Sequence, residues 1–465
     1  MKEKIYLYHT NDLHSHFENW SRIRDYILSR KRHHQKKGEP VFVFDIGDHA
    51  DRSHPLTEGS KGRENVRLLN EVGYDAVTIG NNEGITFPYE DLNHLYDEAE
   101  FEVVVANLFT KEGSRPDWVI PTLIKKTTKG TKIGIVGVTA EYGALYDRLG
   151  WHVTSAKDEL KAQVRVLKEQ ADIILFLSHL GIREDEWVAE ECPDIDVIMG
   201  GHTHHVLELG KIHNKSLLAA AGKYGMYIGK IELEFDHETK RITDKTASLV
   251  NTESLPPSSN EMREIMQWHE EGKKLLSGVV TNLDQSLDHH PLAPTHLAKM
   301  LSSAIVEWCG ADCGMITGGL LLDELPAGPV TVYDLHRILP HPINPCAVEL
   351  SGSELKEVLR QSQNQEWPTT VVKGLGFRGT ILGTFVYEGI ESRANQFFVN
   401  DEPVETDKTY TVATVDMFTF GFFFPAMQRA KKQYFMPEFL RDILKEKIKR
   451  LEPDFSKNSI QSTDK

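Results

Sequence analysis

The sequence predicts an α/β fold, in which a layered domain of strands and helices is followed by a smaller, mixed α+β domain. Short apolar runs rich in Val, Ile and Phe recur through the first half of the chain, as in strands that are covered on both faces. Segments with helical periodicity lie between these runs, and such alternation favours a layered α/β arrangement. With 465 residues, of which 40% are hydrophobic, the chain is long enough to build two cores.

The first half of the chain is predicted to contain seven strands and two helices. One helix covers Arg22–Lys36 and ends before Gly38. The other, Ser155–Glu169, begins with a Ser-x-x-Asp capping box and has apolar residues at helical spacing. The predicted strands are Ile5–Tyr8, Val41–Phe44, Ala76–Ile79, Glu102–Ala106, Lys132–Val138, Ile173–Leu177 and Asp196–Met199.

The composition and periodicity of the sequence change near residue 250, where a turn-rich stretch precedes a polar helical segment. Further on, a capping box at Ser351–Glu354 predicts another helix, and Lys408–Val415 alternates like a strand. The expected order is a layered domain, a linker helix, a second domain and a polar tail, over residues 1–250, 251–277, 278–450 and 451–465.

Charge and composition restrict the class of partner. A net charge of −16 argues against a nucleic-acid duplex, because binding to a phosphate backbone requires a basic face. No stretch approaches the length of a membrane span and the N-terminus does not resemble an export signal, so a cytoplasmic protein with no membrane partner is expected. The four scattered cysteines favour reduced core thiols over disulfides or a thiolate metal site. The sequence leaves the oligomeric state unknown.

Side chains of metal-ligand type follow five of the predicted strands. In an open α/β sheet, sites form just beyond the carboxyl ends of the strands, so these side chains are expected to converge. Asp12 and His14 are two residues apart, as are His202 and His204, and an extended backbone points such pairs the same way. The joint pattern is far more specific than any one motif. The seven candidate ligands are Asp12, His14, Asp48, Asn81, His179, His202 and His204.

These ligand types favour two divalent cations as cofactors. Imidazole, carboxylate and amide together suit manganese, zinc, cobalt or ferrous iron, and the histidines make magnesium a poorer match. Two such metals about 3.5–4 Å apart can hold a hydroxide between them and clamp the attacking and leaving oxygens of a phosphoester. An aspartate with two oxygens is the natural bridge between them, and Asp48 is the candidate.

These motifs resemble the 5′-nucleotidase family of calcineurin-like metallophosphoesterases, in a bacterial cytoplasmic form, over most of the chain. The resemblance implies that one metal takes Asp12, His14, Asp48 and His204, and that the other takes Asp48, Asn81, His179 and His202. It also implies a C-terminal domain that holds the base of a nucleotide between aromatic rings. The motifs that carry it are His9–His14, Gly47–Asp48, Gly80–Asn81, Ser178–His179 and Gly200–His204.

The resemblance breaks at the third ligand loop. The family reads Gly-Asn-His-Glu-Phe-Asp there, whereas this chain reads Gly-Asn-Asn-Glu-Gly-Ile at residues 80–85. Asn82 therefore replaces the family's catalytic histidine, and the aspartate that would orient that histidine is absent. An amide donates a hydrogen bond but carries no charge, and the loss of one preorganised donor typically costs about 10²–10³ in kcat. Slower hydrolysis is expected, and His205 and His49 are the nearest residues in sequence that could compensate.

The second half resembles the family's substrate-recognition domain less specifically. The arginine that the family commonly has after a Gly-Gly turn is missing, because Gly318-Gly319 is followed by three leucines. Arg378 is a candidate substitute, and the rings of Phe377 and Phe418 are candidates for stacking on a base. The full set of candidate substrate contacts is Asn344, Phe377, Arg378 and Phe418.

The expected function is a two-metal-dependent phosphoester hydrolase that releases phosphate from nucleoside monophosphates. A phosphodiesterase for cyclic nucleotides or dinucleotides is the alternative within hydrolases, because the missing histidine and arginine fit a different leaving group or substrate charge. The alternative from another class is a metal-dependent nucleotide-binding regulator that has lost its chemistry, and Asn82 is its main support.

Overall fold

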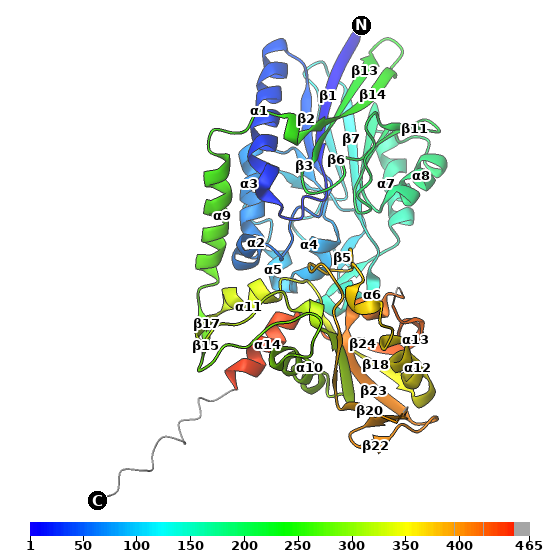
Figure 1. Cartoon of the computed structure of the whole chain (residues 1–465). Helices are drawn as coiled ribbons and strands as arrows, with labels where there is room; N and C mark the ends of the chain where they lie inside the picture. Colours follow the sequence, from blue (N-terminus) through cyan, green and yellow to red (C-terminus); the bar gives the residue numbers. More distant parts are fainter. Residues whose placement is uncertain (395, 422, 451–465) are drawn as a thin grey trace, which may run out of the picture. The chain divides into compact units, whose positions relative to one another are not determined.

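The computed structural model describes residues 1–394, 396–421 and 423–450 (Figure 1). These residues form two compact units, one from Met1 to Gly272 and one that begins at Lys273. The predicted combination of a layered α/β domain with a mixed second domain is confirmed. The polar tail expected at residues 451–465 lies outside the described residues.

Two six-stranded sheets form the centre of the first unit. In the first sheet, β1, β2, β3 and β4 run parallel to one another. In the second sheet, β7, β9, β10 and β12 are parallel. The order of the first sheet is β14 (Arg241–Asn251), β13 (Tyr227–Asp236), β1 (Lys2–Thr10), β2 (Val41–Asp45), β3 (Ala76–Val77) and β4 (Glu102–Val103). The order of the second is β11 (Lys211–His213), β12 (Ser216–Ala219), β10 (Val197–Gly200), β9 (Ile173–His179), β7 (Lys132–Thr139) and β6 (Thr122–Lys126).

Helices cover the outer face of each sheet, so that the first unit has four layers. Figure 1 shows α1 and α3 on one side of the sheets and α7 and α8 on the other. The inner faces share one apolar core, to which Leu7 and Phe44 contribute from the first sheet and Leu175 and Met199 from the second. The helices are α1 (Trp20–Lys37), α2 (Pro55–Ser60), α3 (Arg63–Val72), α4 (Asn81–Thr86), α5 (Tyr89–Asn93), α6 (Gly143–Leu149), α7 (Ala156–Lys168) and α8 (Ile182–Glu191), and a separate ladder joins β5 (Leu108–Thr110) to β8 (Trp151–Val153).

All seven predicted strands and both predicted helices of the first half are present, but two strands are shorter than the sequence predicts. β3 ends at Val77 and β4 at Val103. Beyond β3 the chain leaves the ladder to form a loop, where the Gly80 N–H donates to the Glu83 side chain. Beyond β4 it joins the second sheet, where the Ala106 N–H donates to the carbonyl of Gly137 over 2.7 Å. The residue after each strand still donates within the first sheet, Thr78 to the carbonyl of Asp45 and Val104 to that of Val77, and the chain departs only beyond it.

The long antiparallel hairpin of β13 and β14 is absent from the sequence-based prediction. β13 pairs with β1 along eight residues, from Lys2 to His9. This pairing encloses β1 between β13 and β2, so the strand that leads to Asp12 lies inside the sheet rather than at its edge. The hairpin therefore fixes the position of the first ligand loop.

The helix between the two halves, α9 (Glu261–Leu275), packs mainly on the first unit. The ring of Trp268 lies 5.6 Å from that of Phe17, centroid to centroid. Gly272 lies against the backbone at Leu56, where a Cβ atom would be 2.7 Å from the Leu56 Cα. The compact first unit ends at this glycine, within the helix.

The second unit is built on a five-stranded sheet and its own apolar core. The predicted helix at Ser351 is confirmed, because Ser351 and Glu354 form a complete capping box at the start of α12. The sheet has the order β19 (Phe385–Glu388), β16 (Cys313–Thr317), β23 (Thr409–Val415), β18 (Pro345–Ser351) and β24 (Lys431–Tyr434). Smaller sheets join β15 (Val279–Leu283) to β17 (Gly328–Thr331), and β20 (Ile390–Arg393), β21 (Gln396–Val399) and β22 (Glu402–Pro403). The helices are α10 (His296–Cys309), α11 (Val332–Ile338), α12 (Gly352–Ser362), α13 (Pro425–Arg429) and α14 (Leu440–Lys449).

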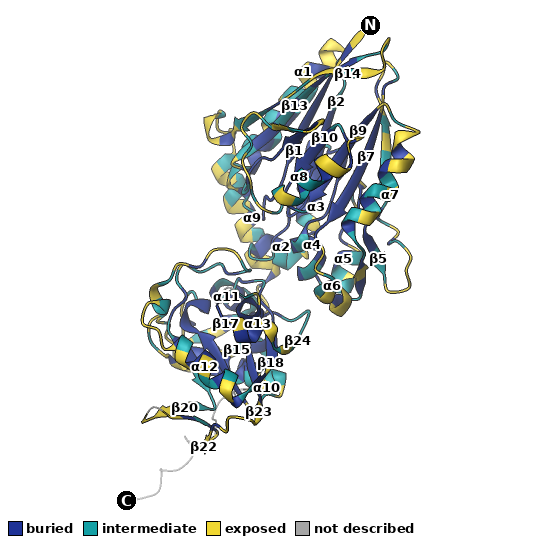
Figure 2. Ribbon diagram, turned by 90° about the vertical axis from the view of Figure 1, so that its right-hand side faces the viewer, coloured by how far each residue is buried: buried dark blue, intermediate teal, exposed yellow. Residues whose placement is uncertain are grey.

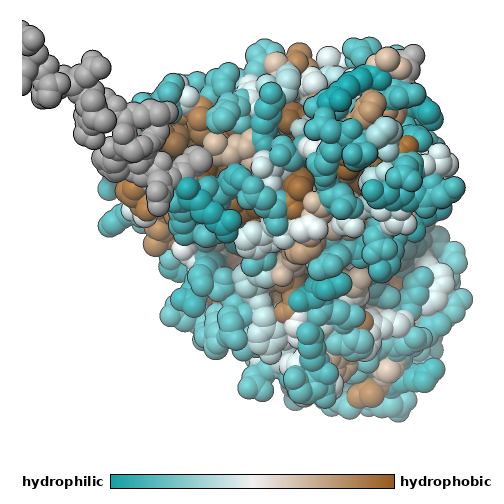
Figure 3. All heavy atoms as spheres, turned by 90° about the horizontal axis from the view of Figure 1, so that it is seen from below, coloured by the Kyte–Doolittle hydropathy of each residue, from teal (hydrophilic) through white to brown (hydrophobic). Residues whose placement is uncertain are grey.

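Burial follows the layers of each unit. Figure 2 shows the central strands of the first unit as buried and the outward faces of its helices as exposed. On the face drawn in Figure 3, hydrophilic side chains predominate and apolar areas between them are small. Among the described residues, no helix is both long and apolar enough to cross a membrane.

Candidate metal centre

The seven candidate ligands lie at the carboxyl ends of parallel strands from both sheets. Asp12 and Asp48 follow β1 and β2, and Asn81 is the first residue of α4, just beyond β3. His179 is the last residue of β9, and His202 follows β10. The two sheets meet here, because the backbone N–H of His202 donates to both carboxylate oxygens of Asp12, over 3.0 and 3.1 Å.

Five of these seven residues have a left-handed backbone conformation, which L-amino acids other than glycine rarely adopt. Each such residue typically costs about 1–3 kcal/mol and persists only where its surroundings impose it. The surroundings therefore impose these turns, and the turns set the directions in which the ligand side chains leave the backbone. The φ angles are 51° at Asp12, 51° at His14, 53° at Asp48, 71° at His202 and 56° at His204.

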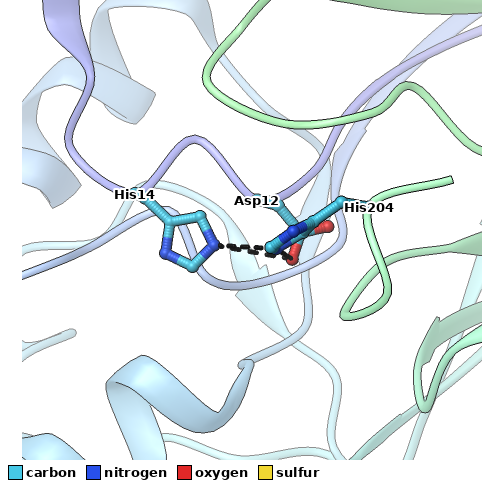
Figure 4. A group of neighbouring side chains, drawn as sticks. All are labelled: Asp12, His14 and His204. Atoms are coloured by element: carbon cyan, nitrogen blue, oxygen red, sulfur yellow. Dashed lines mark hydrogen bonds and ion pairs between the residues drawn. The ribbon is translucent and has the colours of Figure 1, made fainter. Parts of the chain in front are cut away.

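Asp12, His14 and His204 form the first of two overlapping groups (Figure 4). The Nε2 atoms of the two histidines lie 3.2 Å apart. Asp12 Oδ1 lies 3.4 Å from Nε2 of His204 and 3.8 Å from Nε2 of His14. One ligand atom of each residue thus faces the same small volume, as three ligands of one cation would.

Asp12, Asp48 and His179 form the second group, so that Asp12 belongs to both. Asp48 also lies close to a histidine of each group, because its Oδ2 is 3.4 Å from Nε2 of His179 and 3.8 Å from Nε2 of His14. Asn81 and His202 complete the set, with Asn81 Oδ1 2.8 Å from His202 Nδ1. The structure therefore groups five of the candidate ligands around two shared carboxylates, with the paired Asn81 and His202 beside His179.

Three of the histidines present one ring nitrogen to the ligands and the other to a partner outside them. His179 Nδ1 donates to the carbonyl of Ile46 over 2.7 Å. His202 Nε2 lies 3.5 Å from the Tyr142 hydroxyl. His14 Nδ1 lies 2.7 Å from the Asn82 amide nitrogen. Metal-binding histidines are commonly held in this way, because the outer partner fixes both the ring orientation and the tautomer.

Electrostatics favour a cation at this place. Burial alone lowers the pKa of His179, but the Asp48 and Asp12 carboxylates raise it to about 10. Burial alone raises the pKa of Asp48, but the neighbouring His179 and His14 rings hold it below its usual range. The two carboxylates thus favour positive charge at this place.

The residues present fit a pair of divalent cations. His179 Nε2 is buried, faces Asp48, and has no hydrogen-bond partner among the described residues. Buried polar atoms in native proteins usually have a partner, so an unpaired one that faces a carboxylate marks a ligand position. Nitrogen and oxygen donors without thiolate suit the divalent metals expected from the sequence.

Glu83, which the sequence analysis does not assign to the site, ties two of the ligand loops together. Its buried carboxylate accepts the backbone N–H groups of Asp48 (2.9 Å), Ala50 (2.8 Å) and Gly80 (2.8 Å). It also stands in the first turn of α4, directly after Asn81 and Asn82. A Glu three residues after a glycine at a helix start is the sequence signal of such a cap, and it could have identified this residue.

Gly80 leaves room for the Asp48 carboxylate. A Cβ atom at Gly80 would lie 2.6 Å from both the carboxyl carbon and the backbone nitrogen of Asp48. We expect Gly80→Ala to displace the carboxylate and to lower kcat/KM about 100-fold, because misplacement by about 1 Å can have that effect. The measurement is phosphate release in the presence of Mn²⁺.

The matched control is Gly143→Ala at the start of α6, where no atom lies within 4 Å of the new Cβ. This variant should keep the wild-type rate. Equal rates for the two alanine variants would show that the carboxylate is free to move, and that its position is not set by Gly80.

The two histidines named as possible substitutes for the catalytic one lie in different surroundings. His49 is buried, with its Nδ1 3.2 Å from the Asn65 amide and its ring at a right angle to Trp20. His205 is exposed and its Nδ1 lies 2.9 Å from the Thr203 hydroxyl. The structure brings neither ring into the ligand groups described above.

The candidate substrate residues lie within the second unit. Phe377 is buried and stacks on His341, with centroids 5.2 Å apart and an interplanar angle of 1°. The Arg378 N–H donates to His341 Nδ1 over 2.9 Å. The Asn344 amide donates to the carbonyl of Glu438 over 2.8 Å. Asn344 thus has a structural contact, and Phe377 has one ring face occupied.

Phe418 is fully buried in the core of the second unit. Its ring packs against those of Phe385, Phe423 and Phe424, at centroid distances of 5.8, 5.2 and 5.5 Å. A ring that stacks on a base needs an accessible face, and Phe418 has none in this structure. Aromatic residues in a sequence give no sign of whether they lie in the core or at a surface.

Both parts of the chain are similar to known proteins. The family model of calcineurin-like phosphoesterases matches residues 5–206, and that of the 5′-nucleotidase C-terminal domain matches residues 277–426. An uncharacterized metallophosphoesterase of Bacillus subtilis (strain 168), YunD, is 47% identical over 460 residues, which cover 96% of this chain and 100% of that protein. The 5′-nucleotidase of Bos taurus is 24% identical over 413 residues, which cover 77% of this chain and 72% of that enzyme.

Solved structures show the same fold. The crystal structure of a putative 5′-nucleotidase from Staphylococcus aureus, in complex with alpha-ketoglutarate, aligns with a TM-score of 0.68. The alignment covers 96% of this chain and 97% of that one, at 17% sequence identity. Both domains of this chain therefore have structural counterparts of the same kind.

Proposed function

The chain belongs to the calcineurin-like metallophosphoesterases that carry a 5′-nucleotidase C-terminal domain, and we propose that it releases phosphate from nucleoside monophosphates. The family makes it a metal-dependent phosphoester hydrolase. The main support for the proposal is the grouping of five ligand side chains around two shared carboxylates, with Asn81 and His202 beside them, in a chain that also has the nucleotidase domain.

When bound, two divalent cations at such a site activate water for attack on phosphorus and neutralise charge on the phosphoryl oxygens. Asp12, His14 and His204 would hold one of them, and Asp48, Asn81, His179 and His202 the other. Asp48 is the proposed bridge, since one of its oxygens faces a histidine of each group.

The side chains of the site would position the cations and the substrate, but they would contribute little acid–base catalysis. Asn82 occupies the place of the family's catalytic histidine and carries no charge. The absence of one charged donor predicts slower turnover than in relatives that keep the histidine, typically by about 10²–10³. In this proposal the cations and their ligands would supply the nucleophile and the charge stabilisation, so we expect the loss to reduce the rate and not to abolish it.

The nucleotide preference rests on the second unit. Residues 277–426 match the 5′-nucleotidase C-terminal domain, and Phe377, stacked on His341, is the ring proposed for the base. Both rings are buried, so this role requires neighbouring residues to move when a nucleotide binds. Arg378 follows this pair directly, and its guanidinium is the proposed contact for substrate phosphate.

The test combines metal analysis with a substrate panel. The full chain is purified, its metal content is measured, and phosphate release is followed with nucleoside monophosphates, cyclic nucleotides, dinucleotides and sugar phosphates. Chelation should remove activity and Mn²⁺ should restore it, with nucleoside monophosphates as the fastest class.

Two other results would replace the proposal with one of its alternatives. Faster cleavage of cyclic nucleotides or dinucleotides would assign a phosphodiesterase. Tight, metal-dependent nucleotide binding without phosphate release would assign a regulator, which the missing histidine at position 82 favours.

A further inference from the structure

We propose that Asn82 and Asp51 are positioning residues of the metal centre, which together hold the His14 ring in its metal-binding orientation. This inference rests on the two-cation site of the proposed function, but not on the identity of the substrate. Asn82 would then position a metal ligand and would not act as a weakened catalytic donor. Asp51, which belongs to none of the sequence motifs described above, would have the same positioning role.

The two nitrogens of the His14 ring face different surroundings. Nε2 faces His204 at 3.2 Å and lies 3.8 Å from an oxygen of both Asp12 and Asp48. Nδ1 faces the Asn82 amide at 2.7 Å and Asp51 Oδ2 at 3.4 Å. The ring therefore points one nitrogen at the cation site and the other at this pair.

Metal binding requires the free electron pair on Nε2, so the single ring proton must then be on Nδ1. A proton on Nδ1 needs an acceptor, and the Asp51 carboxylate supplies one. The Asn82 amide lies between them, with its nitrogen 3.3 Å from Asp51 Oδ2. A half-turn of the amide exchanges its oxygen and nitrogen, so that its oxygen can also accept this proton.

Asn82 contacts a second ligand through its backbone. Its N–H donates to Asp48 Oδ1 over 2.7 Å, while its side chain contacts His14. One residue thus fixes two ligands that face the same cation. The residue is only 7% exposed, and its amide group lies against both His14 and Asp51, so little of it is available to a substrate.

Asp51 is itself held firmly. The Ser53 N–H donates to its Oδ1 over 2.8 Å, and its own N–H donates to the Ser15 hydroxyl over 2.8 Å. Its side chain is 1% exposed. A buried carboxylate that is fixed on one oxygen and faces a ligand ring with the other is the usual outer partner of a metal-binding histidine.

The experiment measures metal affinity directly. The metal-depleted full chain is titrated with Mn²⁺ by calorimetry, as wild type, Asn82→Ala, Asp51→Asn and the double variant. Each single change should weaken one binding step about 10–100-fold, the usual effect of losing an outer partner. The double variant should lose less than the sum of the singles, because both act through His14.

Turnover at saturating Mn²⁺ separates a positioning role from a catalytic one. If Asn82 positions a ligand, excess metal should bring kcat of Asn82→Ala to within about threefold of wild type. A catalytic donor would leave a loss of about 10²–10³ that metal does not repair. That second result, or unchanged Mn²⁺ affinity in both single variants, would overturn the inference.

Asn107→Ala is the matched control. Asn107 is a fully buried asparagine whose amide also links two segments, since it donates to the Thr139 carbonyl over 2.9 Å and accepts from the Thr139 N–H over 3.0 Å. It should lower stability without changing Mn²⁺ affinity. Asp51→Asn keeps the shape of the side chain, so it remains informative if Asn82→Ala does not fold.

The outcomes also distinguish this inference from the proposed function. Wild type that binds no Mn²⁺ would remove the metal centre itself. If the wild type binds Mn²⁺ but releases no phosphate from any substrate, the proposed hydrolysis is wrong. The Mn²⁺ affinities of the variants would still decide the roles of Asn82 and Asp51.

Discussion

Asp48→Ala should lose bound metal and activity together, with kcat/KM lower by at least about 10³. Asp48 Oδ2 faces His14 and His179 at 3.8 and 3.4 Å, so removing it takes away the oxygen that faces a histidine of each group and leaves only the Asp12 carboxylate shared between them. The loss should exceed that of a single preorganised donor, because it affects the binding of both cations. The measurements are metal per chain after dialysis against Mn²⁺, and phosphate release.

Asp147→Ala serves as the control, because it removes an exposed aspartate from α6 in the same unit. It should keep the metal content and the rate of wild type. Two cations per chain in Asp48→Ala would contradict the bridging role, and Asp12, which belongs to both groups, would then be the remaining candidate.

Glu83→Ala should give the largest loss of stability among the site residues. Its carboxylate accepts three buried backbone N–H groups, from Asp48, Ala50 and Gly80. Each donor left without a partner typically costs about 1–3 kcal/mol, so we expect a loss of at least about 3 kcal/mol in the free energy of unfolding. The midpoint of thermal unfolding should fall by about 5–10 °C.

Glu90→Ala tests whether this effect belongs to the buried carboxylate. Glu90 is an exposed acid in the first turn of α5, as Glu83 is a buried one in the first turn of α4. Its replacement should change stability by less than about 0.5 kcal/mol. Similar unfolding midpoints for the two alanine variants would mean that water satisfies the three N–H groups in place of Glu83.

The ligand loops could be predicted from the sequence because their signal is local. Asp12, Asp48 and His179 each lie within four residues of the end of a predicted strand, and the carboxyl ends of parallel strands meet at one edge of a sheet. The β13–β14 hairpin also had a local signal that the prediction did not use. Ile231, Leu233 and Phe235 alternate with polar residues, which is the period of a half-buried strand.

The outer partners of the ligands could not be predicted in the same way. Asp51, Tyr142 and Ile46 come from loops that the fold brings together, and no spacing relates them to the histidines that they contact. Proximity in sequence favoured His49 as a helper, whereas in the structure Asp51, two residues further on, lies beside His14. Phe418 shows the same limit in the second unit, where composition cannot distinguish a core ring from an accessible one.

The left-handed turns make the centre vulnerable to selection for heat resistance alone. At Asp12, His14, Asp48, His202 and His204, a glycine would relieve backbone strain that the natural residue imposes. A library screened only for survival at high temperature should therefore accumulate glycine at these five positions. The surviving proteins would be more thermostable but inactive, so thermal screening of this chain has to be combined with a measurement of hydrolysis.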